Sequence, residues 1–146
     1  MDQPSLVDRA DDIIERKKAA TFALLQNWSG ELESYAKQNK TWNDNTGHAT
    51  QGIHGGVDRN EDEFRLYLAH TMKHGQYLEE GTGLYGPHKQ TFEIRPKTKK
   101  ALSWDGAPHP VKKVTHPGMK AQPIIIPTID AHIERIRQTL RELWED

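Results

Sequence analysis

Residues 5–38, SLVDRADDIIERKKAATFALLQNWSGELESYAKQ, contain the longest helical pattern in the chain. Apolar side chains recur there at steps of three and four residues, the spacing that places them along one side of an α-helix. These side chains are Leu6, Ala10, Ile13, Ile14, Leu24, Leu25, Trp28, Leu32 and Tyr35. Ser5, followed three residues later by Asp8, resembles a capping box in which Asp replaces the usual Glu. The pattern predicts one long helix over 5–38, of about 50 Å at about 1.5 Å per residue.

A helix of this length is longer than a small domain needs to cover its own sheet. The chain has 146 residues, of which 34% are hydrophobic, so its core is small, or part of its apolar surface is buried only by neighbouring copies. We therefore expect part of the long helix to pack on another molecule.

The middle of the chain, 46–116, predicts a mostly antiparallel sheet of about four strands. Apolar and polar side chains alternate there, and turn-forming residues separate the runs. The candidate strands are 46–57, 61–71, 92–96 continued by 99–104, and 111–115. Asp58, Arg59 and Asn60 are expected to form the turn between the first two strands. The glycines at 52, 55 and 56 favour a β-bulge in the first strand.

Helical spacing returns at the end of the chain. Apolar residues follow one another there at steps of four and three, namely Ile129, Ile133, Ile136, Leu140 and Leu143. Pro123 or Pro127 is expected to start this helix, which we predict over 123–145. Residues 74–81 are predicted as a short or single helical turn that Gly81 ends. The order of elements predicts one α+β domain over 1–146.

Charge is unevenly distributed, although the formal net charge is only -1. Residues 95–120 hold seven Lys or Arg against the single acid Asp105, whereas the first 33 residues and 58–63 lean acidic. One interpretation is that these are solvated faces. The other is that the basic lobe of one copy pairs with the acidic lobe of the next, a head-to-tail contact that closes into rings.

No catalytic, cofactor or metal site is expected. The chain has no cysteine, so disulfides and thiolate zinc ligands are excluded. His70 and His74 have the spacing of a zinc peptidase helix, but no Glu follows the first His, and a strand is expected to end there. Neither a nucleophile elbow nor a phosphate-binding loop is present. Wholly apolar runs such as 124–126 are far shorter than a membrane span, so no membrane partner is expected.

An alternative function is nucleic-acid binding through the basic 95–120 lobe. Lys97, Lys99 and Lys100 are followed by Trp104 and then by Lys112 and Lys113. Basic residues interleaved with an aromatic ring are typical of single-strand binders. This alternative predicts binding that weakens steeply with salt.

Three short segments resemble a known protein family. They are TWNDNTGHATQG at 41–52, HGQYLE at 74–79 and HPGMKAQPIIIP at 116–127. Their order and spacing resemble the small tail-component proteins of long-tailed bacteriophages, which are neck or tail-completion proteins. The motif residues that this resemblance marks as candidate interface or motif positions are Trp42, Asn43, Thr46, Gly47, His74, Gly75, Tyr77, Leu78, Glu79, His116, Pro117, Gly118 and Lys120.

The resemblance implies a structural α+β protein that works as a ring between the head connector and the tail. Its implied partners are copies of itself, a head-connector or stopper protein, a tail-terminator or tail-tube protein, and DNA that passes through the lumen. It implies a place in the virion neck, and in the host cytoplasm during assembly. Neither an enzymatic activity nor a cofactor is implied.

The motif residues also have roles that follow from their chemistry. The turn at 42–47 is expected to reverse the chain after the long helix. Gly118 permits a backbone turn that other residues adopt only at a cost. Tyr77 and Leu78 form an aromatic–aliphatic pair on a short turn, which is typical of an interface anchor.

Overall fold

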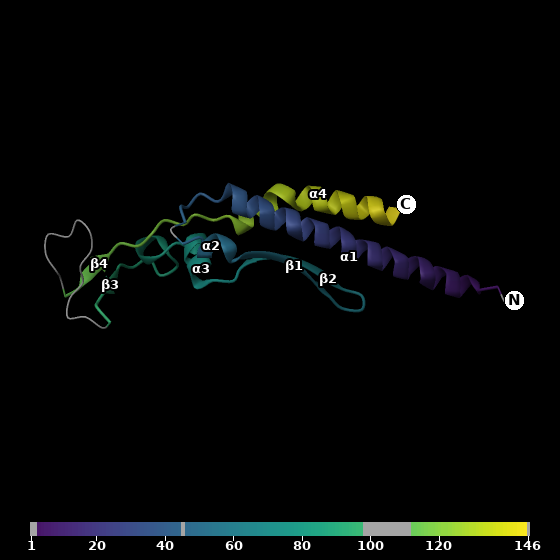
Figure 1. Cartoon of the computed structure of the whole chain (residues 1–146), viewed down its shortest axis with the longest axis horizontal. Coiled ribbons are helices and arrows are strands. Elements are labelled where there is room, and N and C mark those ends of the chain that lie inside the picture. The colour runs from purple at the N-terminus through teal and green to yellow at the C-terminus, as the bar shows by residue number, and fades with distance from the viewer. Residues whose placement is uncertain (1–2, 45, 98–111, 146) are drawn as a thin grey trace. The chain divides into compact units, whose positions relative to one another are not determined.

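The computed structural model describes residues 3–44, 46–97 and 112–145, and they form an α+β structure. The predicted class is therefore confirmed: a long first helix, antiparallel strands and a closing helix (Figure 1). The chain divides into two compact units, Met1–Thr71 with Ile124–Asp146, and Met72–Pro123. A single domain over 1–146 stays a prediction.

Helix α1, Leu6–Asn39, is the longest element of the first unit. The predicted capping box is present, because the Ser5 amide donates to Asp8 Oδ2 at 2.9 Å and the Asp8 amide donates to Ser5 Oγ at 3.1 Å. Side chains at steps of four and three residues form its buried stripe, which consists of Thr21, Leu25, Trp28, Leu32 and Ala36. The predicted helix at 5–38 is therefore confirmed to within one residue at each end.

A two-stranded antiparallel hairpin, β1 (Ile53–Arg59) and β2 (Phe64–His70), packs against α1. The prediction of a strand from residue 46 is wrong at its start, since the short helix α2, His48–Gln51, precedes β1. The predicted turn at 58–60 lies slightly later, because β1 continues through Arg59 and the Asn60 amide donates to the Glu63 carbonyl at 2.8 Å.

The predicted β-bulge is absent from this hairpin, where every residue from Ile53 to Arg59 has one partner on β2. Gly55 has a different role. A Cβ at this position would lie 2.4 Å from the carbonyl oxygen of Ser29, so the strand backbone rests directly on α1. Glycine is needed here for the close approach of a helix and a strand.

Helix α4, Ile125–Glu145, lies along α1 on the other side of the first unit's core (Figure 1). It begins two residues after the predicted start, with Pro127 in its first turn. The centre of its buried face is Thr128, His132 and Ile136, whereas the other predicted apolar positions are only half-buried. Trp28 Nε1 donates to Thr139 Oγ1 at 3.0 Å, and Trp144 Nε1 donates to Thr21 Oγ1 at 2.9 Å. These two bonds fix the alignment of α4 on α1.

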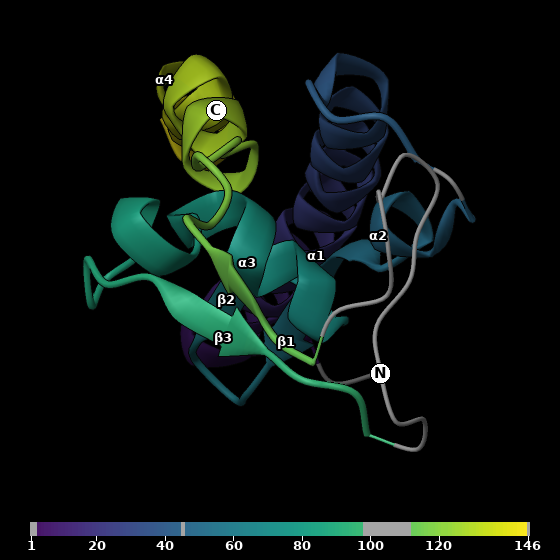
Figure 2. The same ribbon diagram turned by 90° about the vertical axis from the view of Figure 1, so that its left-hand side faces the viewer.

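The second unit contains α3 (Lys73–Glu80), the 3-10 turn η1 (Gly83–Tyr85), β3 (Phe92–Ile94) and β4 (Val114–His116). Strands β3 and β4 pair antiparallel, as Figure 2 shows. The four strands among the described residues thus form two sheets of two strands each, where one sheet was predicted. The predicted strand at 99–104 and loop at 105–110 lie outside the described residues.

Candidate functional site

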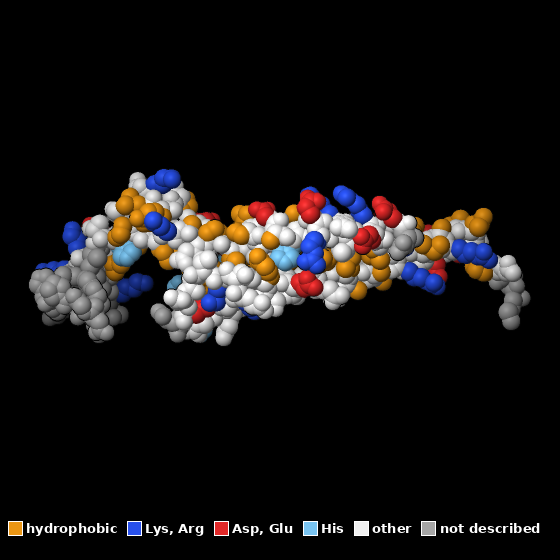
Figure 3. Space-filling model, turned by 90° about the horizontal axis from the view of Figure 1, so that it is seen from above, with side chains coloured by type: hydrophobic (Ala, Val, Ile, Leu, Met, Phe, Trp, Pro, Cys, Tyr) orange, Lys and Arg blue, Asp and Glu red, His pale blue; other side chains and the backbone are white. Residues whose placement is uncertain are grey.

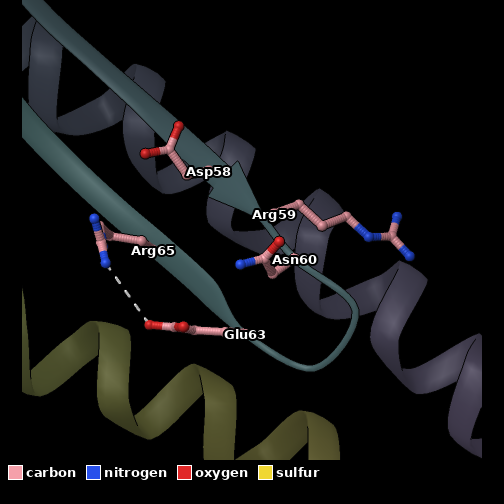
Figure 4. A pocket seen from close by; sticks show the side chains of 5 residues that line it. All are labelled: Asp58, Arg59, Asn60, Glu63 and Arg65. Carbon is pink, nitrogen blue, oxygen red and sulfur yellow. Dashed lines mark ion pairs between the residues drawn. The ribbon is translucent and has the colours of Figure 1, made fainter.

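The pocket beside the β1–β2 turn holds no catalytic arrangement. It measures about 240 Å³ and is lined by Asp58, Arg59, Asn60, Glu63 and Arg65. Arg65 and Glu63 form an ion pair at 3.9 Å with both side chains 69% exposed, and such pairs contribute little in water. In Figure 4 the Arg59 side chain points away from this pair, and its guanidinium lies 5.4 Å from the Phe22 ring centre. The pocket therefore presents solvated charges, without a nucleophile beside a base.

The two histidines with zinc-peptidase spacing lie on different elements. His70 ends strand β2, and His74 belongs to helix α3, so the two imidazoles do not share one helical face. In the part of the chain that the structure describes, no three His, Asp or Glu side chains are grouped so that they could hold a metal ion.

The first motif, around Trp42, forms the connection between α1 and α2. Trp42 is buried, and its ring centre lies 6.0 Å from that of His70. Gly47 has φ 77° and precedes α2, whereas Asn43 and Thr46 are exposed. The expected chain reversal after the long helix is thus built by a buried indole and a left-handed glycine. Asn43 and Thr46 remain available at the surface.

Asp44 organises this turn through three donors. Its carboxylate accepts hydrogen bonds from the Thr50 hydroxyl and from Trp42 Nε1, the latter at 3.3 Å, and Lys40 Nζ lies 3.3 Å away. The hydrogen bond from the Thr50 hydroxyl is the largest cause that lowers the pKa of Asp44 below its ordinary value of 3.8. Desolvation opposes it, and Lys40 and Trp42 lower the pKa further.

We expect the Trp42 turn to loosen in acid. Because the pKa of Asp44 is lower in the folded chain, its stabilisation is complete above pH 3.8 and is lost as the pH falls through the lowered pKa. The nitrogen and proton chemical shifts of the Trp42 indole Nε1–H, followed by NMR, should report this transition. Asp44→Asn serves as the control, since its Trp42 signal should not titrate in that range. A titration that persists in Asp44→Asn would assign the effect to another group.

The second and third motifs meet in the second unit. The Thr82 amide donates to the Met119 carbonyl at 2.9 Å, the Leu84 amide to the Pro117 carbonyl at 2.7 Å, and the Gln122 amide to the Leu78 carbonyl at 2.6 Å. The chain after β4 therefore runs beside the end of α3 and η1. Two segments that the resemblance marks separately are one structural feature, while the first motif belongs to the other unit.

Gly118 lies where these two backbones touch. Its φ is 102°, and a Cβ there would lie 1.9 Å from the Thr82 carbonyl oxygen. The Gly118 amide also donates to His116 Nδ1 at 2.9 Å, which fixes the turn. The expected turn at Gly118 is confirmed. Sequence reasoning missed its partner Thr82, whose hydroxyl accepts from the Met119 amide at 2.9 Å, although two flanking glycines were a usable signal.

Helix α3 divides its motif residues between surface and interior. His74 and Tyr77 are exposed, Glu79 is half-buried, and Gly75 and Leu78 are buried. Leu78 was expected at an interface together with Tyr77, and this is corrected, since Leu78 is buried, with only 8% of its surface exposed. Tyr77 stays a candidate anchor.

One exposed apolar surface is the first part of α1, residues 6–16, which we call the α1 lead. Figure 1 shows α1 continuing toward the N-terminus beyond the end of α4. Every side chain of the α1 lead is exposed, from Leu6 at 83% to Ile14 at 43%. Counted back from Thr21 in steps of four and three, the buried stripe of α1 continues into it as Ile14, Ala10 and Val7. Hydrophobic side chains are visible at this end of the helix in Figure 3.

The second exposed apolar surface is the β3–β4 hairpin with its flanking residues, which we call the hairpin face. Phe92 and Ile94, two residues apart on β3, are 40% and 38% exposed. A groove of about 450 Å³, lined in part by Tyr77, Pro87 and Phe92, lies beside them. The groove is lined by one acid, Glu80. The exposed basic side chains that flank β3 and β4 in the sequence are Arg95, Lys97, Lys112, Lys113 and Lys120.

Glu93 is the single acid of β3, and its carboxylate pairs with two of these basic side chains. Arg95 donates to its carboxylate at 3.0 Å, and Lys113 Nζ lies 3.5 Å away. The hydrogen bond from Arg95 and the charge of Lys113 lower the pKa of Glu93 below its usual value. The hairpin face therefore keeps an excess of positive charge.

No helix among residues 3–44, 46–97 and 112–145 has an apolar stretch long enough to cross a membrane. No protein-family model, curated protein or solved structure matches this chain.

Proposed function

We propose that this chain is a structural assembly protein of a long-tailed bacteriophage or a related particle, which joins the head connector to the tail as part of a ring in the neck. The three motif segments at 41–52, 74–79 and 116–127 support the proposal by their order and spacing. The observation that carries it is the α1 lead, a helical segment whose apolar side chains are all exposed, from Leu6 at 83% to Ile14 at 43%.

An uncovered amphipathic segment of this kind favours assembly on physical grounds. Isolated helices shorter than about 12–15 residues are marginally stable in water, so the α1 lead depends largely on its continuity with the packed part of α1. Covering its apolar side chains with a partner gains about 25 cal/mol for each Å² removed from water. Surfaces that tile against other molecules therefore carry the function, and no bond is made or broken.

The proposed partners follow from a place in the neck. They are copies of the chain itself, a head-connector or stopper protein on one side, and a tail-terminator or tail-tube protein on the other. DNA passes through the lumen of the ring. The proposed location is the virion, and the host cytoplasm during assembly. No catalytic residue or cofactor takes part.

Deletion of the gene in its phage is the direct test. We expect separate heads and tails to accumulate, and the infectious titre to fall by several orders of magnitude, because the joint between them is missing. Negative-stain imaging of the lysate and plaque counts measure both effects. Expression of the wild-type chain from a plasmid is the control and should restore joined particles. Normal joined virions in the deletion strain would disprove the proposed function.

The alternative is nucleic-acid binding through the 95–120 lobe, which the exposed bases of the hairpin face favour. Two of these bases, Arg95 and Lys113, are engaged by Glu93, and the formal net charge of the chain is -1. Proteins that bind the phosphate backbone of a nucleic acid need several Lys or Arg side chains that are not already paired with acids. The alternative is therefore ranked second.

A further inference from the structure

We infer that copies of this chain associate head to tail, with the α1 lead of one copy docked on the hairpin face of the next. This inference deepens the proposed function, on which its role in a ring rests, by naming the two surfaces that meet. Both surfaces have exposed apolar side chains, and the two are complementary in charge and in apolar content.

The charges of the two surfaces are opposite. The α1 lead carries four carboxylates, Asp8, Asp11, Asp12 and Glu15, against two arginines. One of these arginines, Arg16, is engaged by Asp12 at 3.0 Å. In the hairpin face, five exposed Lys or Arg side chains flank β3 and β4 in the sequence, against two acids, Glu93 on β3 and Glu80, which lines the groove. Opposite potentials on two patches steer their encounter and disfavour contact of each patch with itself.

The apolar parts of the two surfaces also correspond. Val7, Ala10 and Ile14 continue the stripe with which α1 covers its own core, so the α1 lead presents the face that binds in the rest of the helix. Phe92 and Ile94 project from the same side of a two-stranded antiparallel sheet. In the first unit α1 already lies on a sheet of that kind, the β1–β2 hairpin. The proposed contact repeats this packing between copies.

The contact joins two different surfaces, and this decides the kind of assembly. When one patch binds a different patch on an identical copy, each added copy leaves one of each patch free. Such a contact extends until the rotation between copies closes a ring. Copies of the chain can therefore occupy both of its surfaces, because one neighbour binds the α1 lead and another binds the hairpin face.

Two variants that each lose one surface test the inference. Val7→Asp with Ile14→Asp places carboxylates on the α1 lead, and Phe92→Ser with Ile94→Ser removes the apolar side chains of the hairpin face. All four positions are exposed, so folding should survive, which circular dichroism checks. In sedimentation velocity at low salt, we expect wild type to form species larger than a dimer. Each variant alone should be monomeric, and their mixture should form a one-to-one dimer.

The mixture is decisive because it contains only one intact surface of each kind. Ile126→Asp is the matched control, an exposed apolar residue of α4 outside both surfaces, and it should assemble as wild type does. A wild-type chain that stays monomeric at its solubility limit, or a mixture that fails to pair, would overturn the docking. If the mixture pairs while the deletion phage still forms joined virions, the docking stands and the neck function fails. If the phage needs the gene and the mixture does not pair, only the docking fails.

Discussion

Gly118→Ala is expected to unfold the contact between the second and third motifs and to destabilise the Met72–Pro123 unit by at least about 3 kcal/mol. Two costs act together at this position. The backbone has φ 102°, which L side chains rarely adopt, and the added methyl group would lie 1.9 Å from the Thr82 carbonyl oxygen. That oxygen belongs to a backbone held by the Thr82 amide bond to Met119, so it cannot easily move away. Hydrogen exchange at the amides of Thr82 and Leu84 measures the loss.

Two other glycines separate these costs. Gly47 has φ 77°, but a Cβ there meets only Gln51 Nε2 at 3.7 Å, so Gly47→Ala should show the conformational cost alone, about 1–2 kcal/mol. Gly30 lies within α1, and a Cβ there meets nothing within 4 Å, so Gly30→Ala should stabilise the helix by about 1 kcal/mol. The steric argument fails if Gly118→Ala costs no more than Gly47→Ala.

The two long helices could be predicted from the sequence because their signals are local. A stripe of apolar residues at steps of three and four can be recognised within one segment. The Ser5–Asp8 capping box marks the start of the first helix, and the structure confirms it. Gly81 as the end of α3 and Gly118 as a turn were predictable for the same reason, since φ preference is a property of the residue itself.

The pairing of the strands was not predictable in the same way. Whether four short strands join in one sheet depends on contacts between distant segments, and the structure divides them into two sheets. The polar centre of the α4 face was also missed. His132 is buried because its Nδ1 is bonded to the Thr128 carbonyl at 2.7 Å and its ring packs 4.6 Å from that of Tyr35. Burial of a polar residue follows from such partners, which a single sequence does not reveal.

The candidate site was predictable only as a set of segments. The order of these segments in the sequence does not show that residues 78–84 and 116–122 lie side by side. That arrangement is seen only from the hydrogen bonds between them. The excess length of the first helix led to the expectation of an external partner, which stays a prediction; the structure shows that the α1 lead is exposed. The uneven distribution of charge along the chain could also be predicted from the sequence. The apolar content of the hairpin face could not, because it depends on the exposure of Phe92 and Ile94.

Gly55→Ala is expected to separate the hairpin from α1 and to lower the stability of the first unit by about 2–3 kcal/mol. A methyl group at this position would lie 2.4 Å from the Ser29 carbonyl oxygen and 3.2 Å from its carbon, both of which belong to the helix backbone. Neither a rotamer change nor a local shift relieves this contact. The strand must move outward, and it carries Ile53, which is fully buried, away from the core. Thermal unfolding should show a Tm lower by roughly 10 °C.

Gly56→Ala is the matched control, one residue further along the same strand and facing the other side. There an added methyl group meets the end of the Tyr67 side chain, with the hydroxyl oxygen at 2.4 Å, and that ring can rotate away. The cost should therefore stay at about 1 kcal/mol or less, since alanine also suits a strand better than glycine does. Equal losses in the two variants would mean that glycine serves this strand through its flexibility, as a bulge would require. A loss confined to Gly55→Ala would show that α1 and β1 are held together by direct backbone contact, which a bulge would have prevented.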